Sequence, residues 1–270
     1  MQPIKSYRSR ALDVLRGNWK PYVLASLVLV ILALAIEVPS QLLLKTRPGL
    51  AMAILYPLMF LVYLPIAYAY SVGMLDKYRG AEAPLCGHMF RLFKAEYGRG
   101  LLAYLLMVAY VALMMIGVIF AAVLLSALIG AFTGDVHAFM GPEGPFMWVY
   151  FCLILLGMIP VIIWAYAISQ LFYLAHERKE LKLRECLKLS KKMMKGHKWQ
   201  LFCLQLSFIG WILLGYLTLL IGLIWVLPYM NMAIAIFFDD LEKEYFGVAE
   251  QPAEVPAAEP AAPIEAPAAE

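Results

Sequence analysis

The sequence predicts an all-α membrane protein, a polytopic helical bundle with six transmembrane helices arranged as three hairpins. Its 270 residues are 63% hydrophobic and only 15% charged, with a mean hydropathy of +0.76. Soluble domains contain about 45–50% apolar and about 25% charged residues, so a chain this apolar cannot hide its surface in one water-soluble core. Uncharged apolar windows of about 20 residues, long enough to cross a bilayer, also recur along the chain.

Four spans are separated by charged loops, and the last two are inferred from length. The first four cover about residues 22–44, 50–75, 101–132 and 146–175. Residues 199–238 then contain no charged side chain over forty positions. One helix of that length would be about 60 Å long, roughly twice the hydrocarbon core of about 30 Å. Two spans, about 200–217 and 221–240, are therefore expected, with a turn between Tyr216 and Gly222.

Basic residues alternate along the chain in a way that predicts its orientation. They are frequent in residues 1–20, 77–99 and 178–198, whereas the loop at 133–145 has no Lys or Arg. Because loops rich in Lys and Arg stay in the cytoplasm, we expect a six-span membrane domain at 21–246 with both termini cytoplasmic.

Each predicted hairpin follows a basic, amphipathic segment that ends near a glycine and an aromatic residue. The segments lie at residues 1–20, at 85–100 and at 183–199. We expect them to form short interfacial helices on the anionic inner leaflet and to repeat one another, although any basic segment before a span can look like this. The candidate lipid contacts in the third segment are Lys188, Lys191, Lys192, Lys195, Lys198 and Trp199.

Polar residues inside the predicted spans are candidates for function, because they are costly in a membrane. They are Glu37, Gln170, Gln205 and Asn231. They could line a polar route, or form interhelical hydrogen bonds of about 0.6–2 kcal/mol. For Glu37 we expect pairing with Lys45 or Arg47. At the end of the last span, Asp239, Asp240 and Glu242 could bind a cation or could simply form an acidic, interfacial helix end.

No recognisable catalytic motif appears: there is no P-loop, H-E-x-x-H, G-x-S-x-G or dinucleotide fingerprint. The run "HERKE" at 176–180 is interpreted as a charged cap on the fourth span. Asp135, His137 and Glu143 are possible ligands, but nothing fixes their geometry. We therefore expect no enzyme activity, no metal, no cofactor and no nucleic acid partner.

The end of the chain changes in composition. Residues 247–270 are mostly Ala, Pro and Glu, which cannot bury enough apolar surface to fold, so a disordered tail is expected. It could bind a partner or act as a solubilising spacer.

The last hairpin resembles the bacterial integral membrane family catalogued as domain of unknown function 975. The resemblance rests on "SKKMMKGHKWQLF" followed by "LSFIGW" and "TLLIGLIWVLPY". Its motif positions are Gly196, Ser207, Gly210, Trp211, Thr218, Gly222, Trp225, Pro228 and Tyr229. The resemblance implies a multi-pass protein of the bacterial inner (cytoplasmic) membrane, and it implies no activity.

Two hypotheses for function follow. The first is a non-enzymatic membrane scaffold or a biogenesis or envelope factor that contacts anionic lipids and partner proteins through its basic segments. The second is a small transporter or channel that uses kinked spans and intramembrane polar residues.

Overall fold

The computed structural model describes residues 2–133, 146–218 and 221–250, and every regular element in these ranges is helical. Six of the helical segments are long and apolar enough to cross a membrane. They are Trp19–Thr46, Pro48–Tyr78, Leu85–Phe132, Trp148–Glu177, Lys198–Leu217 and Leu223–Gly247. The predicted fold class is confirmed.

The first hairpin follows α1 (Ile4–Leu15) and begins with α2 (Trp19–Thr46). Its second arm is irregular: α3 (Pro48–Leu50), η1 (Ala51–Leu55), α4 (Tyr56–Leu58) and η2 (Met59–Tyr63) precede α5 (Leu64–Tyr78). Pro65 has no N–H to donate to the carbonyl of Leu61, one turn earlier. The hydroxyl of Tyr97 donates to that carbonyl instead, over 2.9 Å. A side chain from the next hairpin thus replaces a missing backbone hydrogen bond.

The second hairpin consists of α6 (Leu85–Thr133), α8 (Phe146–Ile168) and the short α9 (Leu171–Glu177). A Cβ on Gly157 would lie 2.3 Å from Val118 Cγ1, so this glycine allows α8 to approach α6 closely. The second basic segment, from Leu85 onward, forms a helical stretch before the span, as the sequence predicts. A non-helical residue, Glu96 (φ −118°, ψ 18°), separates it from the span by a kink, although both stretches are included in α6.

The third hairpin follows α10 (Leu183–Met193) and comprises α11 (Lys198–Leu206), α12 (Ile209–Leu217) and α13 (Leu223–Glu250). The chain reverses between α12 and α13, where the length of the uncharged run predicted a turn. The Thr218 hydroxyl donates to Gly215 O (3.0 Å) and accepts from the N–H of Gly222 (2.9 Å). A Cβ on Gly222 would lie only 2.9 Å from Gly215 Cα, so the turn requires a glycine at 222.

Two of the three basic segments end in the same way. Gly17 (φ 78°) follows α1 and Gly196 (φ 92°) follows α10, in a left-handed conformation that glycine adopts without steric cost. Trp19 and Trp199 then open the next helix or its first turn. At the remaining junction, that of the second segment, Gly98 lies inside α6. The two flanking segments therefore share a helix–glycine–helix geometry that the middle one lacks.

The C-terminal boundary differs from the expected one. We placed the start of the disordered tail at 247, but α13 continues to Glu250. The added residues include Ala249 and Glu250, which favour helix, and the proline at 252 disfavours helix at the residue before it. The possible ligands Asp135, His137 and Glu143, and residues 251–270 of the tail, lie outside the described residues.

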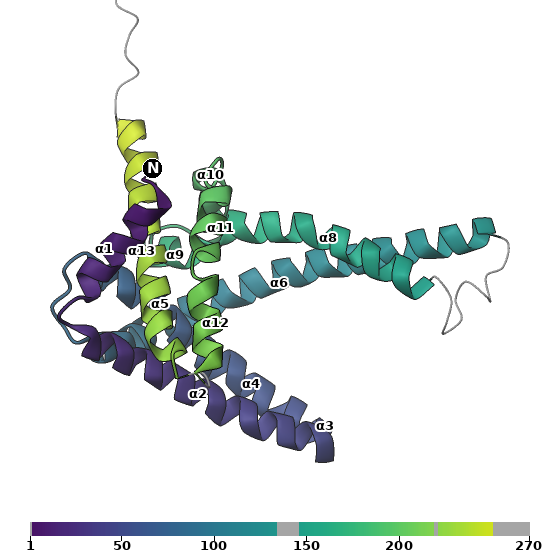
Figure 1. Ribbon diagram of the computed structural model, residues 1–270, viewed down its shortest axis with the longest axis horizontal. Helices are drawn as coiled ribbons and strands as arrows, with labels where there is room; N and C mark the ends of the chain where they lie inside the picture. The colour runs from purple at the N-terminus through teal and green to yellow at the C-terminus, as the bar shows by residue number, and fades with distance from the viewer. Residues whose placement is uncertain (1, 134–145, 219–220, 251–270) are drawn as a thin grey trace, which may run out of the picture.

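The three hairpins diverge from one region, where α1, α5, α9 and α13 meet (Figure 1). The buried core lies in this region and includes Tyr7, Tyr68, Phe237 and Phe238. Farther out, the helices expose large apolar side chains; Ile116 on α6, for example, is 64% exposed. Apolar side chains exposed along long helices suit contact with lipid.

Candidate functional site

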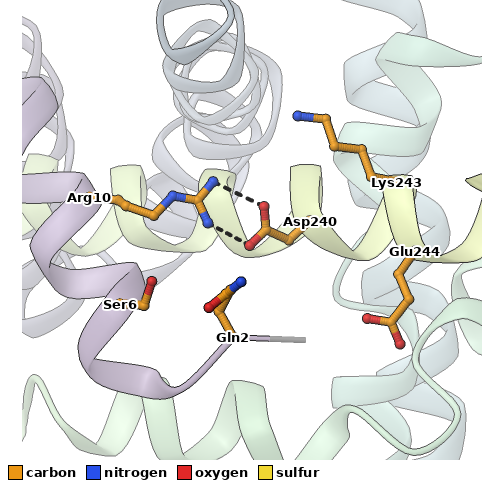
Figure 2. A pocket seen from close by; sticks show the side chains of 6 residues that line it. All are labelled: Gln2, Ser6, Arg10, Asp240, Lys243 and Glu244. Carbon is orange, nitrogen blue, oxygen red and sulfur yellow. Dashed lines mark hydrogen bonds and ion pairs between the residues drawn. The ribbon is translucent and has the colours of Figure 1, made fainter.

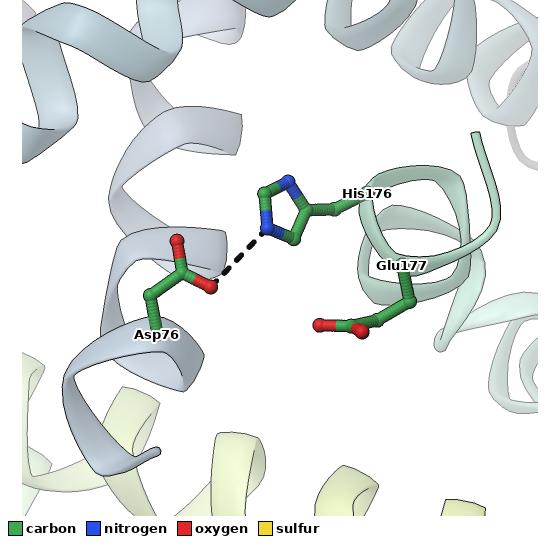
Figure 3. A group of neighbouring side chains, drawn as sticks. All are labelled: Asp76, His176 and Glu177. Carbon is green, nitrogen blue, oxygen red and sulfur yellow. Dashed lines mark hydrogen bonds and ion pairs between the residues drawn. The ribbon is translucent and has the colours of Figure 1, made fainter. Parts of the chain in front are cut away.

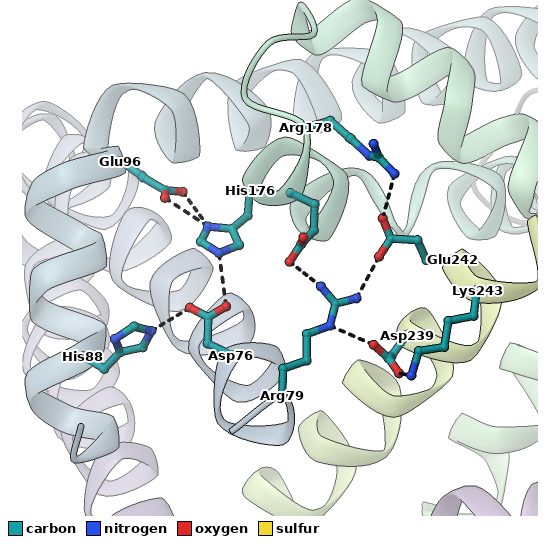
Figure 4. A network of polar contacts seen from close by, with 10 residues as sticks. Asp76, Arg79, His88, Glu96, His176, Arg178, Asp239, Glu242 and Lys243 are labelled. Carbon is teal, nitrogen blue, oxygen red and sulfur yellow. Dashed lines mark hydrogen bonds and ion pairs between the residues drawn. The ribbon is translucent and has the colours of Figure 1, made fainter. Parts of the chain in front are cut away.

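Charged side chains gather where α5, α6, α9 and α13 meet (Figure 4). We call this group the polar hub, and it contains Asp76, Arg79, His88, Glu96, His176, Glu177, Arg178, Lys179, Asp239, Glu242 and Lys243. The residues come from the end of α5, from α6 up to its bend, from the end of α9 and from within α13, so the hub joins all three hairpins.

His176 lies between two carboxylates. Its Nδ1 is 3.0 Å from both carboxylate oxygens of Glu96, and its Nε2 is 3.2 Å from Asp76 Oδ1. An ionised carboxylate only accepts hydrogen bonds, so each ring nitrogen must carry a hydrogen. The geometry thus describes His176 as an imidazolium cation. Glu96 also accepts from the Tyr68 hydroxyl (3.0 Å) and pairs with Lys179 Nζ (2.6 Å).

His88 has a different protonation state from His176. Its Nε2 is 2.6 Å from Asp76 Oδ2, and Arg91 Nη2 is 3.3 Å from its Nδ1. An arginine N–H can only donate, so Nδ1 accepts and the single ring hydrogen is on Nε2. His88 is therefore neutral and donates to Asp76.

Arg79 connects the C-terminal end of α5 to α9 and α13. Its Nη1, Nε and Nη2 atoms each lie 2.7 Å from a carboxylate oxygen, of Glu177, Asp239 and Glu242 respectively. The rigid fork of a guanidinium suits such a convergence of acceptors. The side chain of Asp239 is only 2% exposed and also pairs with Lys243 Nζ at 2.7 Å.

The charges of the polar hub balance. With His176 charged and His88 neutral, it holds five anions and five cations. The anions are Asp76, Glu96, Glu177, Asp239 and Glu242, and the cations are Arg79, His176, Arg178, Lys179 and Lys243. The network is therefore closed electrostatically, without a further ion.

Three hub residues have a donor set that could hold a metal ion. The ligand atoms of Asp76, His176 and Glu177 lie within 4.8 Å of one another (Figure 3). However, the Arg79 guanidinium already pairs with the Glu177 carboxylate, and the hydrogen on His176 Nε2 points at Asp76. A metal would have to displace a guanidinium and a proton, so these residues fit an ion-pair network better than a metal site.

A bidentate ion pair joins α1 to α13. Arg10 Nη1 and Nη2 lie 2.6 and 3.0 Å from the carboxylate oxygens of Asp240 (Figure 2). Nη2 also donates to the hydroxyl of Tyr78. The hydrogen bond to Asp240 raises the pKa of the Arg10 guanidinium. The pair borders a polar cavity of about 670 Å³ between α1 and α13. Asp239 and Asp240 thus bind cations, but these are arginine and lysine side chains from within the chain.

Arg99 holds the end of α9 and the residues that follow it. It donates to four backbone carbonyls, those of Ala175 (2.6 Å), Arg178 (2.9 Å), Lys179 (3.2 Å) and Leu181 (2.8 Å). The last carbonyls of a helix lack intrahelical partners, and a basic side chain can satisfy them. The "HERKE" run is therefore capped by Arg99 and, through its own side chains, also forms part of the polar hub.

The candidate lipid-contact lysines behave differently from the hub cations. We call Lys188, Lys191, Lys192, Lys195 and Lys198 the α10–α11 lysines. Within the described residues none of them pairs with an acidic side chain, whereas Lys179 and Lys243 both do. Lys191 lies over the rings of Trp164 (4.7 Å) and Tyr110 (5.7 Å). Trp199 is 72% exposed next to them.

Glu37 does not form the expected ion pair. Its Oε1 accepts from Gln41 Nε2 over 2.6 Å, one turn away on the exposed side of α2, and neither Lys45 nor Arg47 contacts it in the described chain. The two basic residues lie beyond it at the end of the helix, and the amide one turn away is nearer along the same face.

The other intramembrane polar residues form hydrogen bonds at separate places. The buried Gln170 donates to Ser169 Oγ (3.0 Å), and Gln205 accepts from the Tyr166 hydroxyl (2.6 Å). Asn231 donates to a backbone carbonyl one turn back in α13 (2.9 Å). Only the bond between Gln205 and Tyr166 joins two helices, as the hydrogen-bonding interpretation expects. The bonds of Gln170 and Asn231 are local, and Gln170 Oε1 has no hydrogen-bond partner within the described residues.

The motif residues of the last hairpin have mainly structural contacts. Thr218 and Gly222 form the turn, and Gly196 has the left-handed backbone. Tyr229 accepts from Arg8 Nε (3.3 Å), and its ring packs edge-on against Phe208. The remaining motif positions are Ser207 and Gly210 at the α11–α12 junction, the half-exposed Trp211 and Trp225, and Pro228 within α13.

Sequence reasoning missed the polar hub, although a signal was present. Asp76 and Glu96 are acids at the ends of otherwise basic, predicted cytoplasmic segments. Acids in such positions are candidates for pairing with the surrounding cations, and this is the role that both have in the structure.

A family model described as "Protein of unknown function (DUF975)" matches residues 1–245, which confirms the resemblance seen in the motif. The matched range includes the whole polar hub and the α10–α11 lysines. No curated protein and no solved structure matches the chain.

Proposed function

Because the chain belongs to the DUF975 family of proteins of unknown function, we propose its role from the site alone: a non-enzymatic membrane scaffold or envelope-biogenesis factor. In this role the α10–α11 lysines contact anionic lipid headgroups and partner proteins at the cytoplasmic face of a bacterial inner membrane. The polar hub keeps the three hairpins in place behind this surface.

One contrast carries the proposal. The hub cations are all paired, whereas the α10–α11 lysines have no acidic partner in the described chain. Unpaired lysines near a membrane surface are attracted to anionic lipid by about 1 kcal/mol each. The exposed Trp199 beside them suits the headgroup level of a bilayer, where tryptophan is enriched.

The orientation is part of the proposal. Six crossings would bring both termini to the same side of the membrane. We propose that this side is the cytoplasm, because segments rich in Lys and Arg are retained there. A reporter domain fused after Tyr245 should therefore give a cytoplasmic signal, and an extracytoplasmic signal would reject the six-span orientation.

The proposal is tested by comparing two double variants in nanodiscs that contain phosphatidylglycerol and phosphatidylcholine. Lys192→Gln with Lys195→Gln should lower the enrichment of phosphatidylglycerol around the purified protein by about fivefold or more. The matched control, Lys45→Gln with Arg47→Gln, removes the same charge from exposed, unpaired residues at the far end of α2. Equal lipid enrichment in the two variants would count against the proposed contact.

A second candidate function is transport of a small solute, and a cavity favours it. About 340 Å³ of space lies between α2, α5 and α13, lined in part by Ser26, Tyr70 and Asn231. The hydroxyls of Ser26 and Tyr70 are 2.8 Å apart. If the cavity carries solute, reconstituted protein should show a flux that Asn231→Leu abolishes. No flux across a broad panel of solutes would reject this candidate.

A further inference from the structure

An apolar groove lies between α8 and α11, on the side where the second and third hairpins diverge (Figure 1). Its volume is about 350 Å³, and its lining is almost entirely apolar. One wall is a stripe along α8, formed by Ile159, Ile162, Ile163 and Tyr166, and the other wall consists of Trp199 and Phe202 of α11. The stripe extends over eight residues, about 10 Å along the helix.

The aromatic wall of the groove is held in place by contacts on both sides. Phe202 packs edge-on against Tyr166 and lies at a tilt to Trp199, with ring centroids 5.9 and 5.1 Å apart. The Tyr166 hydroxyl is fixed by Gln205, at 2.6 Å. The shape of the groove is therefore built into the packing of α8 against α11.

The groove contains a single charged residue, Lys198 at the start of α11. No carboxylate pairs with its ammonium group in the described part of the chain. An unpaired cation at an apolar groove is complementary to an amphipathic anion. Among such anions, the one present throughout a bilayer is a phospholipid with a net negative headgroup.

We infer that this groove is a binding site for one anionic glycerophospholipid. An acyl chain lies against the three isoleucines, the phosphate pairs with Lys198, and Trp199 contacts the glycerol region. This inference rests on the proposed function and deepens it, because it assigns one lipid to a defined groove rather than a general attraction to the lysine surface. It concerns a different set of residues from the two lysines tested above.

The test uses the full chain in phosphatidylcholine nanodiscs that contain a trace of phosphatidylglycerol with a photoreactive diazirine in its acyl chain. After irradiation, mass spectrometry of peptides should find the label concentrated on residues 159–166 and 198–202. Unlabelled phosphatidylglycerol added to the discs should reduce this labelling about fivefold more than the same amount of additional phosphatidylcholine, because Lys198 favours the anionic headgroup.

Three variants test whether the label reports binding in the groove rather than contact with bulk lipid. Ile163→Trp fills the groove and should reduce its labelling severalfold, whereas Ile116→Trp, on the exposed face of α6, should leave it unchanged. Lys198→Gln should remove the preference for phosphatidylglycerol in competition while acyl-chain labelling remains. Unfolding midpoints of all variants identify any that fail to fold, and the competition experiment on the unmodified chain does not depend on them.

The outcomes distinguish this inference from the proposed function. Labelling spread evenly over the exposed apolar residues, or equal competition by both lipids, would overturn the groove as a site. If the groove is not labelled selectively while the variant Lys192→Gln with Lys195→Gln still lowers lipid enrichment, the groove inference is wrong and the proposed lipid contact of the α10–α11 lysines is retained. If the groove labels as expected and that double variant has no effect, lipid binding is confined to the groove.

Discussion

Arg79 and Asp239 are separated by 160 positions in the chain, yet Arg79 Nε lies 2.7 Å from Asp239 Oδ1. This pair joins the end of the second span to the end of the sixth. The contact links the first and third hairpins, and it pairs a partly exposed guanidinium with the almost completely buried side chain of Asp239.

Replacement of Arg79 by alanine should lower stability strongly. Three carboxylates would lose their shared cation. Because Asp239 is buried but Arg79 is 31% exposed, the loss should lie between the roughly 1 kcal/mol of a surface pair and the about 3–5 kcal/mol of a fully buried one. The measurement is the unfolding midpoint in detergent micelles. Arg79→Lys should recover only part of the loss, since an ammonium cannot present three donors in a planar fork. Arg47→Ala, at an exposed and unpaired site, is the control, and equal midpoints for the two alanine variants would contradict this role.

His176 and Glu96 should be energetically coupled. His176→Gln removes the cation between two carboxylates, so it should destabilise the protein, and Glu96→Gln in the same chain should reduce that loss. A double-mutant cycle should give a coupling of about 0.5–3 kcal/mol. The neutral His88 provides the comparison: His88→Gln should cost about 1 kcal/mol, the value of a hydrogen bond. Equal costs for the two histidines would refute the assignment of charge to His176.

The turn of the third hairpin should tolerate no side chain at residue 222. Gly222→Ala places a Cβ 2.7 Å from Thr218 Oγ1 and 2.9 Å from Gly215 Cα, so the backbone has to move. Such overpacking costs about 1–3 kcal/mol and should lower the unfolding midpoint. Gly210→Ala is the matched control, because a Cβ there meets nothing within 4 Å. A drop for Gly210→Ala as large as that for Gly222→Ala would rule out steric demand as the cause.

Removal of the Arg99 guanidinium should loosen the end of α9. Arg99→Ala removes a donor from four carbonyls, of which that of Arg178 still accepts from the N–H of Leu181 (3.1 Å). Each of the others that stays buried and unpaired costs about 1–3 kcal/mol. Hydrogen exchange in a peptide that covers residues 174–183 should become faster. Lys94→Ala changes an exposed residue of α6, the helix that carries Arg99, and should leave the exchange rate unchanged. Unchanged exchange in the Arg99 variant would show that water satisfies these carbonyls.

The architecture could be predicted from the sequence because it depends on lengths and composition. The forty uncharged residues before Asp239 were too long for one crossing, and this fixed the turn near Thr218 and Gly222. Hydrophobic thickness is a constant of the bilayer, so a count of residues is enough to decide the number of spans.

The polar hub could not be predicted in the same way. Asp76 and His176 are 100 positions apart, and their contact depends on how α5 and α9 pack. Sequence shows that a charge lies near the end of a span but not which partner faces it. Glu37 illustrates the opposite error: two cations are near it in sequence, yet they lie farther along, at the end of α2, and Gln41 binds its carboxylate instead.

The two arginine contacts of α13 affect the order in which the protein can assemble. Arg10 and Arg79 are translated well before the carboxylates that they bind, Asp240 and Asp239, which belong to α13. Until that helix is inserted, both arginines remain without these partners. A chain truncated before residue 239 therefore cannot complete its core, and quality-control proteases have a physical basis for recognising it.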